Sequence, residues 1–93
     1  MYYAYVLESL KDRKFYVGYT ENLKIRFESH SKGLVKSTKE RRPLRLVYYK
    51  ACLHQQDATR REKYLKCYYG KMFLRKRLKS YFDFYKRNEG KKD

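Results

Sequence analysis

The sequence predicts an α+β fold in which a small three-stranded antiparallel sheet is flanked by helices, in the order ββαβαα. Three stretches rich in tyrosine and β-branched residues predict the strands, and apolar residues at helical spacing predict the helices. A chain of 93 residues provides one hydrophobic core. We therefore expect a single domain at residues 1–80, followed by an aromatic and then basic polar tail at residues 81–93.

The first two strands are predicted at residues 2–8 (YYAYVLE) and 14–19 (KFYVGY), joined by a short polar turn. Alternation places Tyr3 and Tyr5 on one face of the first strand, where cross-strand aromatic packing alone could explain them. Gly18 lies inside the second strand, and a glycine there indicates a bulge or the close approach of a bulky group.

The pattern changes from strand to helix at Thr20, which we expect to cap a helix. Leu23 and Phe27 then recur at helical spacing, and Ser31 and Gly33 end the segment.

Arg26 and His30 lie four residues apart on this helix, so their side chains are neighbours on one face. Arginine binds phosphate oxygens in bidentate fashion, and histidine can move protons near them. The pair is a candidate phosphate site, with a solvated surface pair as the alternative.

Residues 32–43 (KGLVKSTKERRP) predict a strongly basic loop, because they lack apolar periodicity and contain the only proline. The segment LRLVYYKACL at residues 44–53 has the composition of a third strand.

A second helix is predicted from Asp57 to about Lys66, with one face formed by Ala58, Leu65 and Tyr69. We expect Gly70 to break it and residues 71–79 (KMFLRKRLK) to form a short basic amphipathic helix.

Glu62 lies four residues after Ala58 and three before Leu65, on the apolar face of this helix. A carboxylate there is costly unless it is paired or binds a metal. Glu62 could form an ion pair with Arg26 or Arg61, or it could bind a divalent ion, and its spacing is compatible with both.

The charge balance points to a polyanionic partner. Lys and Arg number 25 against 10 Asp and Glu, which gives a formal net charge of +15. So large an excess on a short chain is typical of nucleic-acid binding.

Cys52 and Cys67 lack the spacing and histidine partners of a zinc site, so we expect reduced thiols. The start of the chain, MYYAYVLES, does not resemble a signal peptide, and no segment has transmembrane length. We expect a cytoplasmic protein that does not enter membranes.

Taken together, these residues resemble the GIY-YIG nuclease superfamily, and within it the small stand-alone domains similar to excision-nuclease subunits. The two strand motifs match YAY at residues 3–5 and YVG at residues 16–18, and the motif tyrosines Tyr5 and Tyr16 are eleven residues apart. The similarity continues through Thr20, Asn22, Leu23, Arg26 and His30 and resumes in the segments RRPLRLVYY and ATRREKYLK. It covers roughly residues 2–79.

The resemblance implies hydrolysis of a phosphodiester with one divalent metal ion, Mg²⁺ or Mn²⁺, held by Glu62. Arg26 would bind the scissile phosphate, and Tyr5 or Tyr16 would orient or deprotonate the attacking water. His30 would assist proton transfer or contact the phosphate. The candidate substrate-binding residues are Gly18, Lys36, Lys39, Arg41 and Arg42.

The leading hypothesis is a metal-dependent DNA endonuclease, structure-selective and linked to repair or recombination, with RNA as an alternative substrate. A second hypothesis is a nucleic-acid-binding module with weak or no catalysis. It is motivated by Tyr68, Tyr69 and Gly70, which stand near where many family members have an asparagine. The sequence gives no indication of oligomeric state.

Overall fold

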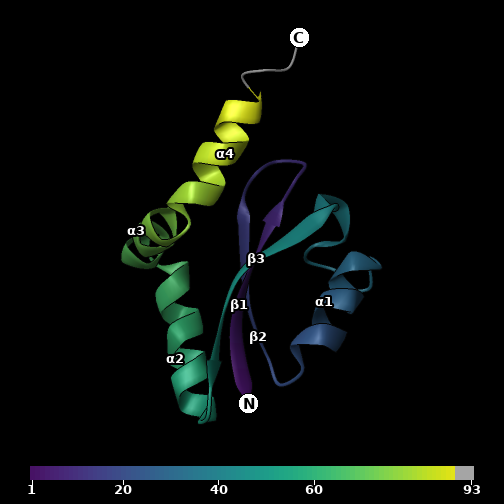
Figure 1. Cartoon of the computed structure of the whole chain (residues 1–93). Coiled ribbons are helices and arrows are strands. Elements are labelled where there is room, and N and C mark those ends of the chain that lie inside the picture. Colours follow the sequence, from purple (N-terminus) through teal and green to yellow (C-terminus); the bar gives the residue numbers. More distant parts are fainter. Residues whose placement is uncertain (90–93) are drawn as a thin grey trace. The chain divides into compact units, whose positions relative to one another are not determined.

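The structure is a computed structural model that describes residues 1–89. Its elements are β1 (Tyr2–Ser9), β2 (Phe15–Thr20), α1 (Leu23–Ser31), the short 3-10 helix η1 (Lys39–Arg41), β3 (Leu44–Cys52), α2 (Gln55–Lys66), α3 (Tyr68–Arg77) and α4 (Lys79–Glu89) (Figure 1). The chain divides into two compact units, residues 1–63 and residues 64–93.

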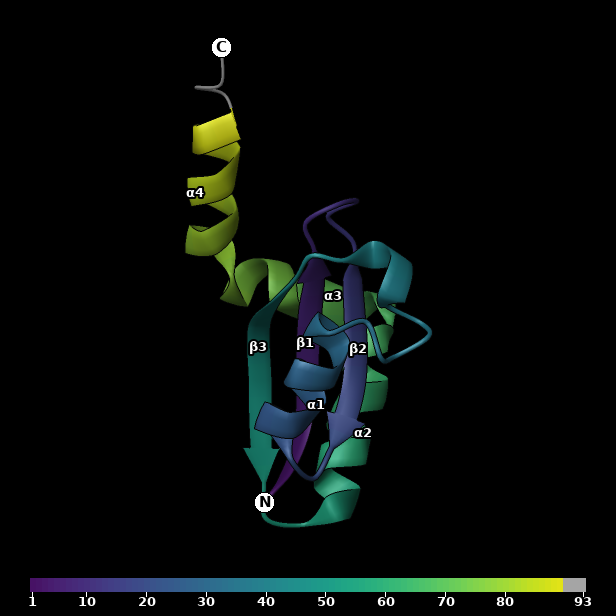
Figure 2. The same cartoon turned by 90° about the vertical axis from the view of Figure 1, so that its right-hand side faces the viewer.

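The first unit contains the predicted antiparallel sheet, with strand order β2-β1-β3 (Figure 2). Both pairings are antiparallel, and the β1–β3 register shifts by one residue between Val6 and Leu7. The three predicted strands are therefore confirmed, with β1 in the centre.

Helices cover both faces of β1 within this unit. The helix α1 lies on one side of the sheet, and residues 55–63 of α2 lie on the other side (Figures 1 and 2). As a result Ala4, Tyr5, Val6 and Leu7 are all buried, including residues whose side chains point to opposite faces.

The turn between β1 and β2 is fixed by local hydrogen bonds around Ser9. The Ser9 hydroxyl accepts from the backbone N–H of Lys11 and of Asp12, at 3.2 Å each, and donates to the carbonyl of Arg41 at 2.7 Å. Arg13 closes the turn with a positive φ of 62°. These hydrogen bonds hold the turn in the shape that lets β2 pair with β1.

The N-cap of helix α1 lies two residues later than the sequence indicated. Its N-cap is Asn22, whose side-chain oxygen accepts from the Ile25 N–H at 3.1 Å. Thr20, the predicted cap, instead accepts from the Asn22 N–H at 3.1 Å. The prediction of Thr20 as cap was wrong because its hydroxyl is used in the turn that leads to the cap.

In the second unit, the break between helices lies at Cys67, the N-cap of α3, and not at Gly70. Gly70 lies inside α3, where a Cβ would collide with the backbone carbonyl of Tyr64 and come within 2.7 Å of Leu65 Cα. Tyr69, predicted to share the buried face of the second helix, is 71% exposed on α3. Glycine at position 70 therefore permits close approach of two backbones and does not end a helix.

The segment predicted as a polar tail forms a further helix over most of its length. The helix α4 covers Lys79–Glu89, so the described order is ββαβααα. Its aromatic residues pack on each other, with the Tyr81 and Tyr85 ring centroids 4.8 Å apart. The remainder of the predicted tail, residues 90–93, lies outside the described residues.

No helix among residues 1–89 has both the length and the apolar character needed to cross a membrane.

Candidate active site

Tyr5 forms the centre of the candidate site, and the register of the hairpin explains its position. Tyr5 on β1 pairs with Gly18 on β2, so both face α1. A Cβ on Gly18 would overlap Cζ and Oη of Tyr5 and lie 2.8 Å from its Cε1. The Tyr5 ring therefore lies directly over Gly18, and this is the close approach that the sequence indicated.

The last turn of α1 brings His30 to the Tyr5 hydroxyl. His30 Nε2 lies 2.8 Å from Tyr5 Oη, and His30 Nδ1 lies 2.7 Å from Thr38 Oγ1. His30 is fully buried, and both of its ring nitrogens have protein partners. It can therefore act on a substrate through Tyr5, but it has no surface with which to contact a phosphate.

Burial and the nearby positive charge of Arg26 lower the pKa of His30 from 6.5 to about 4. The ring is consequently neutral near pH 7, with one nitrogen as donor and the other as acceptor.

Acidification should destabilise the fold through this histidine. Between about pH 6.5 and about pH 4 the unfolded state binds a proton at His30 that the folded state does not, so stability falls as pH falls through this window. The loss has an upper limit of about 3 kcal/mol. Urea unfolding at several pH values should show a steeper acid loss for wild type than for His30→Gln. His54→Gln, at an exposed position, should keep the wild-type slope. Equal slopes for wild type and His30→Gln would contradict the assignment.

Arg26 approaches the same hydroxyl from the preceding turn of α1. Its Nε donates to Tyr5 Oη at 3.4 Å, and the side chain is half-buried. The hydrogen bond to Tyr5 and the nearby Tyr16 raise the pKa of Arg26, so the guanidinium is charged. Among the described residues Arg26 forms no ion pair with a carboxylate, which leaves its charge available to an anion.

Tyr16 joins the group from β2. It pairs across the sheet with Leu7, two positions along from the Tyr5–Gly18 pair, and so faces α1 as well. Its ring centroid lies 5.2 Å from that of His30 and 6.4 Å from that of Tyr5. Tyr16 is half-buried, whereas Tyr5 is only 1% exposed. Of the two tyrosines, Tyr16 is the more accessible to solvent.

The negative charge of Glu62 on α2 affects the pKa of Tyr5. Burial raises the pKa of Tyr5, the hydrogen bond from Arg26 lowers it, and the negative charge of Glu62 raises it further. Glu62 is half-buried between Ala58 and Leu65, both of which are fully buried. This burial agrees with the prediction that Glu62 lies on the apolar face of α2. Within residues 1–89, the side chain of Arg26 bonds Tyr5 and does not pair with Glu62.

The chemistry of Glu62 fits a hard divalent ion. Within residues 1–89 no group of three or more His, Cys, Asp or Glu side chains gathers to hold a metal. A single carboxylate suits Mg²⁺, which commonly takes few protein ligands and completes its shell with water and substrate phosphate. It does not suit Zn²⁺, which requires three or four protein ligands.

The predicted substrate-binding loop has two kinds of basic residue. Lys36 and Lys39 are exposed. Arg41 donates to the Phe15 carbonyl at 3.3 Å and lies 3.5 Å from the Asp12 carboxylate. The Arg41 guanidinium therefore links the loop to the β1–β2 turn and to the start of β2.

Arg42 also has a local structural contact. Its Nε donates to the Lys39 carbonyl at 2.9 Å, and its guanidinium lies against Gly33, whose φ is +78°. The side chain is exposed, so its outer face can still meet an anion. The substrate-binding role of these four loop residues stays a prediction.

Thr38 is the residue that the sequence reading missed. It lies in the basic loop, is fully buried, and contacts His30 from eight residues further along the chain. The only signal in the sequence was an uncharged Ser-Thr pair inside a strongly charged segment.

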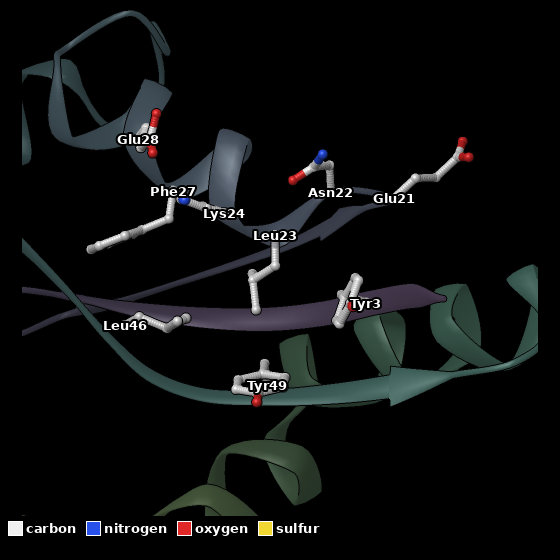
Figure 3. A pocket seen from close by; sticks show the side chains of 9 residues that line it. All are labelled: Tyr3, Glu21, Asn22, Leu23, Lys24, Phe27, Glu28, Leu46 and Tyr49. Atoms are coloured by element: carbon white, nitrogen blue, oxygen red, sulfur yellow. The ribbon is translucent and has the colours of Figure 1, made fainter.

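A separate hollow of about 630 Å³ lies at the other end of α1 (Figure 3). Leu23 points from α1 toward the sheet, where Tyr3, Leu46 and Tyr49 form an apolar floor. Glu21 and Glu28 are at its border. None of the predicted catalytic residues lines this hollow, so it is distinct from the candidate active site.

Comparison with known proteins relates this geometry to a family. The model of the GIY-YIG catalytic domain matches residues 1–77. A UPF0213 protein of Clostridium perfringens is 39% identical over 67 residues, covering 71% of this chain and 71% of its own length. A UPF0213 protein of Bacillus licheniformis is 38% identical over 90 residues, covering 96% of this chain and 86% of its own length.

A solved structure has the same fold. The solution NMR structure of a UPF0213 protein from Bacillus halodurans is 36% identical and superposes with a TM-score of 0.50. The match covers 80% of this chain and 82% of that chain. The α+β fold predicted from the sequence is thus confirmed.

Proposed function

Because the chain belongs to the GIY-YIG catalytic-domain family, we propose that it is a divalent-metal-dependent endonuclease that hydrolyses phosphodiester bonds in DNA. The observation that carries the proposal is the convergence of Tyr5, Tyr16, Arg26 and His30 on one face of the sheet, with the charge of Glu62 acting on Tyr5. The family has a nuclease-type fold, and its motifs resemble the stretches of this sequence that contain these residues.

Arg26 binds the scissile phosphate. The Tyr5 hydroxyl accepts a hydrogen bond from Arg26 Nε, and this bond holds the guanidinium in place. The two terminal nitrogens of Arg26 then remain for phosphate oxygens. The raised pKa of Arg26 ensures a positive charge where negative charge develops in the transition state.

Tyr16 is the tyrosine that contacts the attacking water. Its side chain is half-buried, while Tyr5 is 1% exposed and sits between Arg26 and His30. Tyr5 positions Arg26, and it can receive or release a proton next to that guanidinium.

Glu62 holds the divalent ion, Mg²⁺ or Mn²⁺. When bound, the ion supplies charge neutralisation on the phosphate and stabilises the departing oxygen. The Glu62 carboxylate also keeps a negative charge near Tyr5, which favours the protonated phenol until a cation offsets it.

Electrostatics favours a nucleic-acid backbone as the substrate. The net charge of +15 attracts a polyanion, and the exposed side chains of Lys36 and Lys39 can contact its phosphates. The affinity for nucleic acid should therefore fall steeply as the salt concentration rises. We assign the activity to structure-selective cleavage in repair or recombination in the cytoplasm, with RNA as a competing substrate to be tested directly.

A binding module without catalysis is the second candidate. It is favoured by Tyr68 and Tyr69, which stand near where many members of the family it resembles have an asparagine and which are 70% and 71% exposed. Such a module would bind nucleic acid with the same salt dependence and leave it intact.

The test is a cleavage assay on plasmid, nicked and branched DNA and on single-stranded RNA, with Mg²⁺, with Mn²⁺ and with chelator. Wild type should cut DNA only with metal, and Arg26→Ala should lower the rate about 100- to 1,000-fold. The matched control is Arg60→Ala, which removes the same charge from an exposed arginine paired with Asp57. It should cut at close to the wild-type rate.

Three results would decide against parts of the proposal. Cleavage that persists in chelator would rule out the metal-dependent mechanism. Equal losses in Arg26→Ala and Arg60→Ala would remove the specific role of Arg26. Salt-sensitive binding with no cleavage of any substrate would favour the binding module.

A further inference from the structure

We propose that one face of α3 binds an unpaired nucleic-acid strand. This surface, the α3 face, consists of Tyr68, Tyr69, Phe73, Lys76 and Arg77. Bases of the strand stack on the two tyrosines, and its phosphates contact the two cations. The role of the α3 face in cleavage rests on the proposed function, whereas binding of the strand can be measured in chelator without any cleavage.

Two adjacent tyrosines at the start of α3 are strongly exposed. Tyr68 is 70% exposed and Tyr69 is 71% exposed, although large aromatic rings gain free energy when they leave water. Their ring centroids lie 5.4 Å apart at an interplanar angle of 75°. An edge-to-face pair of this kind cannot cover both faces of both rings, so a flat ring surface is left on which another group can stack.

Helical spacing places a further ring and two cations on the same side of α3 as Tyr69. Phe73 follows Tyr69 by four residues, Lys76 follows it by seven, and the next residue is Arg77. The rise of the helix separates Tyr69 from Lys76 by about 10 Å along the axis. This length corresponds to about three nucleotides of a stacked strand, so one short strand can reach both the tyrosines and the cations.

The two cations lie beside the Phe73 ring, at a hollow of about 330 Å³. Phe73, Lys76 and Arg77 line this hollow. Arg77 Cζ lies 5.2 Å from the centroid of the Phe73 ring, a distance at which the guanidinium is attracted to the ring. Among the side chains of residues 1–85, neither Lys76 nor Arg77 forms an ion pair with a carboxylate. Both charges are therefore available to a phosphate.

The charge of α3 favours a polyanion as the occupant of this face. The helix carries four Lys or Arg residues and no Asp or Glu. A second copy of this chain would place like charges against each other and is disfavoured. An anionic partner that also presents flat aromatic groups fits both the cations and the exposed rings. In a duplex the bases are paired and stacked inside, so a strand with unpaired bases is the nucleic acid that can use the tyrosines.

The test is fluorescence anisotropy of the full chain in chelator, with labelled single strands of DNA and of RNA of about 15 nucleotides and with a duplex of the same DNA sequence. Replacing both Tyr68 and Tyr69 by Ala should lower the affinity for the single strands by about 10-fold or more, because stacking on both rings is lost. The affinity for the duplex should not change. Replacing both by Phe, which keeps the rings, should preserve wild-type binding. So should Tyr49→Ala, which removes an exposed tyrosine from β3.

The salt dependence measures the phosphate contact. Lys76→Gln should reduce the slope of log affinity against log salt for a single strand by about 0.7, because one contact with a phosphate is lost. Lys24→Gln, which removes an exposed lysine from α1, should leave the slope as in wild type. The double alanine variant should also keep the wild-type slope, because it removes no charge.

Two binding results would overturn the proposal. One is wild-type affinity for both single strands in the double alanine variant, in a protein whose melting shows that it is folded. If that variant also loses a dimer that wild type forms in sedimentation, the α3 face is an interface between copies. The other result is an equal loss of affinity for single strands and for duplex, which would indicate a general effect on binding.

Cleavage separates this proposal from the proposed function. If wild type binds single strands through the tyrosines but cuts no substrate with metal, the proposed function fails and the α3 face stands. If wild type cuts branched DNA with metal, and the double alanine variant binds and cuts it equally well, the α3 face fails alone.

Discussion

Glu62→Gln should abolish cleavage by at least about 1,000-fold while leaving the fold and DNA binding intact. Glutamine keeps the shape of the side chain, so the buried neighbours Ala58 and Leu65 should be undisturbed. The substitution removes the carboxylate charge that a divalent ion requires, and it removes a negative charge that opposes the DNA backbone. Binding should therefore be as tight as in wild type or tighter, measured by fluorescence anisotropy with labelled DNA.

The matched control is Glu28→Gln, which makes the same charge change at an exposed position on α1. It should bind and cleave like wild type. Cleavage by Glu62→Gln at the wild-type rate would refute Glu62 as the metal ligand. Equal loss in both variants would indicate a general effect of charge.

Gly18→Ala should destabilise the fold by about 1–3 kcal/mol, although it adds a single methyl group. The new Cβ would overlap Cζ and Oη of Tyr5, and the ring has no free space because Tyr5 is 1% exposed. Tyr5 must then move away from His30 and Arg26, so activity should fall as well. Urea or thermal unfolding measures the loss of stability.

A double-mutant cycle distinguishes this overlap from a general strand effect. In a Tyr5→Ala background the ring is absent, so adding Gly18→Ala should cost much less than it does in wild type. If the cost of Gly18→Ala is the same in both backgrounds, the loss arises from the β2 backbone and not from Tyr5.

The strands and their tyrosines were predictable because their signals are local. Alternation in β1 placed Tyr3 and Tyr5 on one face, and Gly18 was marked as a point of close approach. Which group approaches Gly18 was not predictable, because it depends on the pairing of Tyr5 with Gly18 across the sheet. Register is a property of two strands together.

The candidate site residues on helices were proposed from the sequence for a different reason. Arg26 and His30 follow from helical spacing and from the motif order of the family, as does Glu62. Thr38 was not predictable, since it reaches His30 through a loop whose path is set by backbone hydrogen bonds such as that from Leu34 to Ser29. Irregular backbone leaves no periodic pattern in a sequence.

After α2, expectations based on local sequence propensity differed from the structure. Gly70 was interpreted as a helix break, and residues 81–93 as an aromatic and then basic polar tail. In the structure Gly70 lies in α3 against the backbone of Tyr64 and Leu65 at the end of α2, where a Cβ would collide. The segment Lys79–Glu89 forms α4. A contact between two backbones explains the case of Gly70.

The five-residue turn that joins β1 to β2 has a consequence for how the site tolerates change. The bonds of Ser9 and the positive φ of Arg13 hold this turn, and its length, together with the pairing of the two strands, sets which β2 residue lies beneath Tyr5. An insertion or deletion of one residue would replace Gly18 by Val17 or Tyr19 and place a side chain where the Tyr5 ring now lies. The turn contains none of the proposed catalytic residues, yet its length helps to place the glycine on which Tyr5 rests.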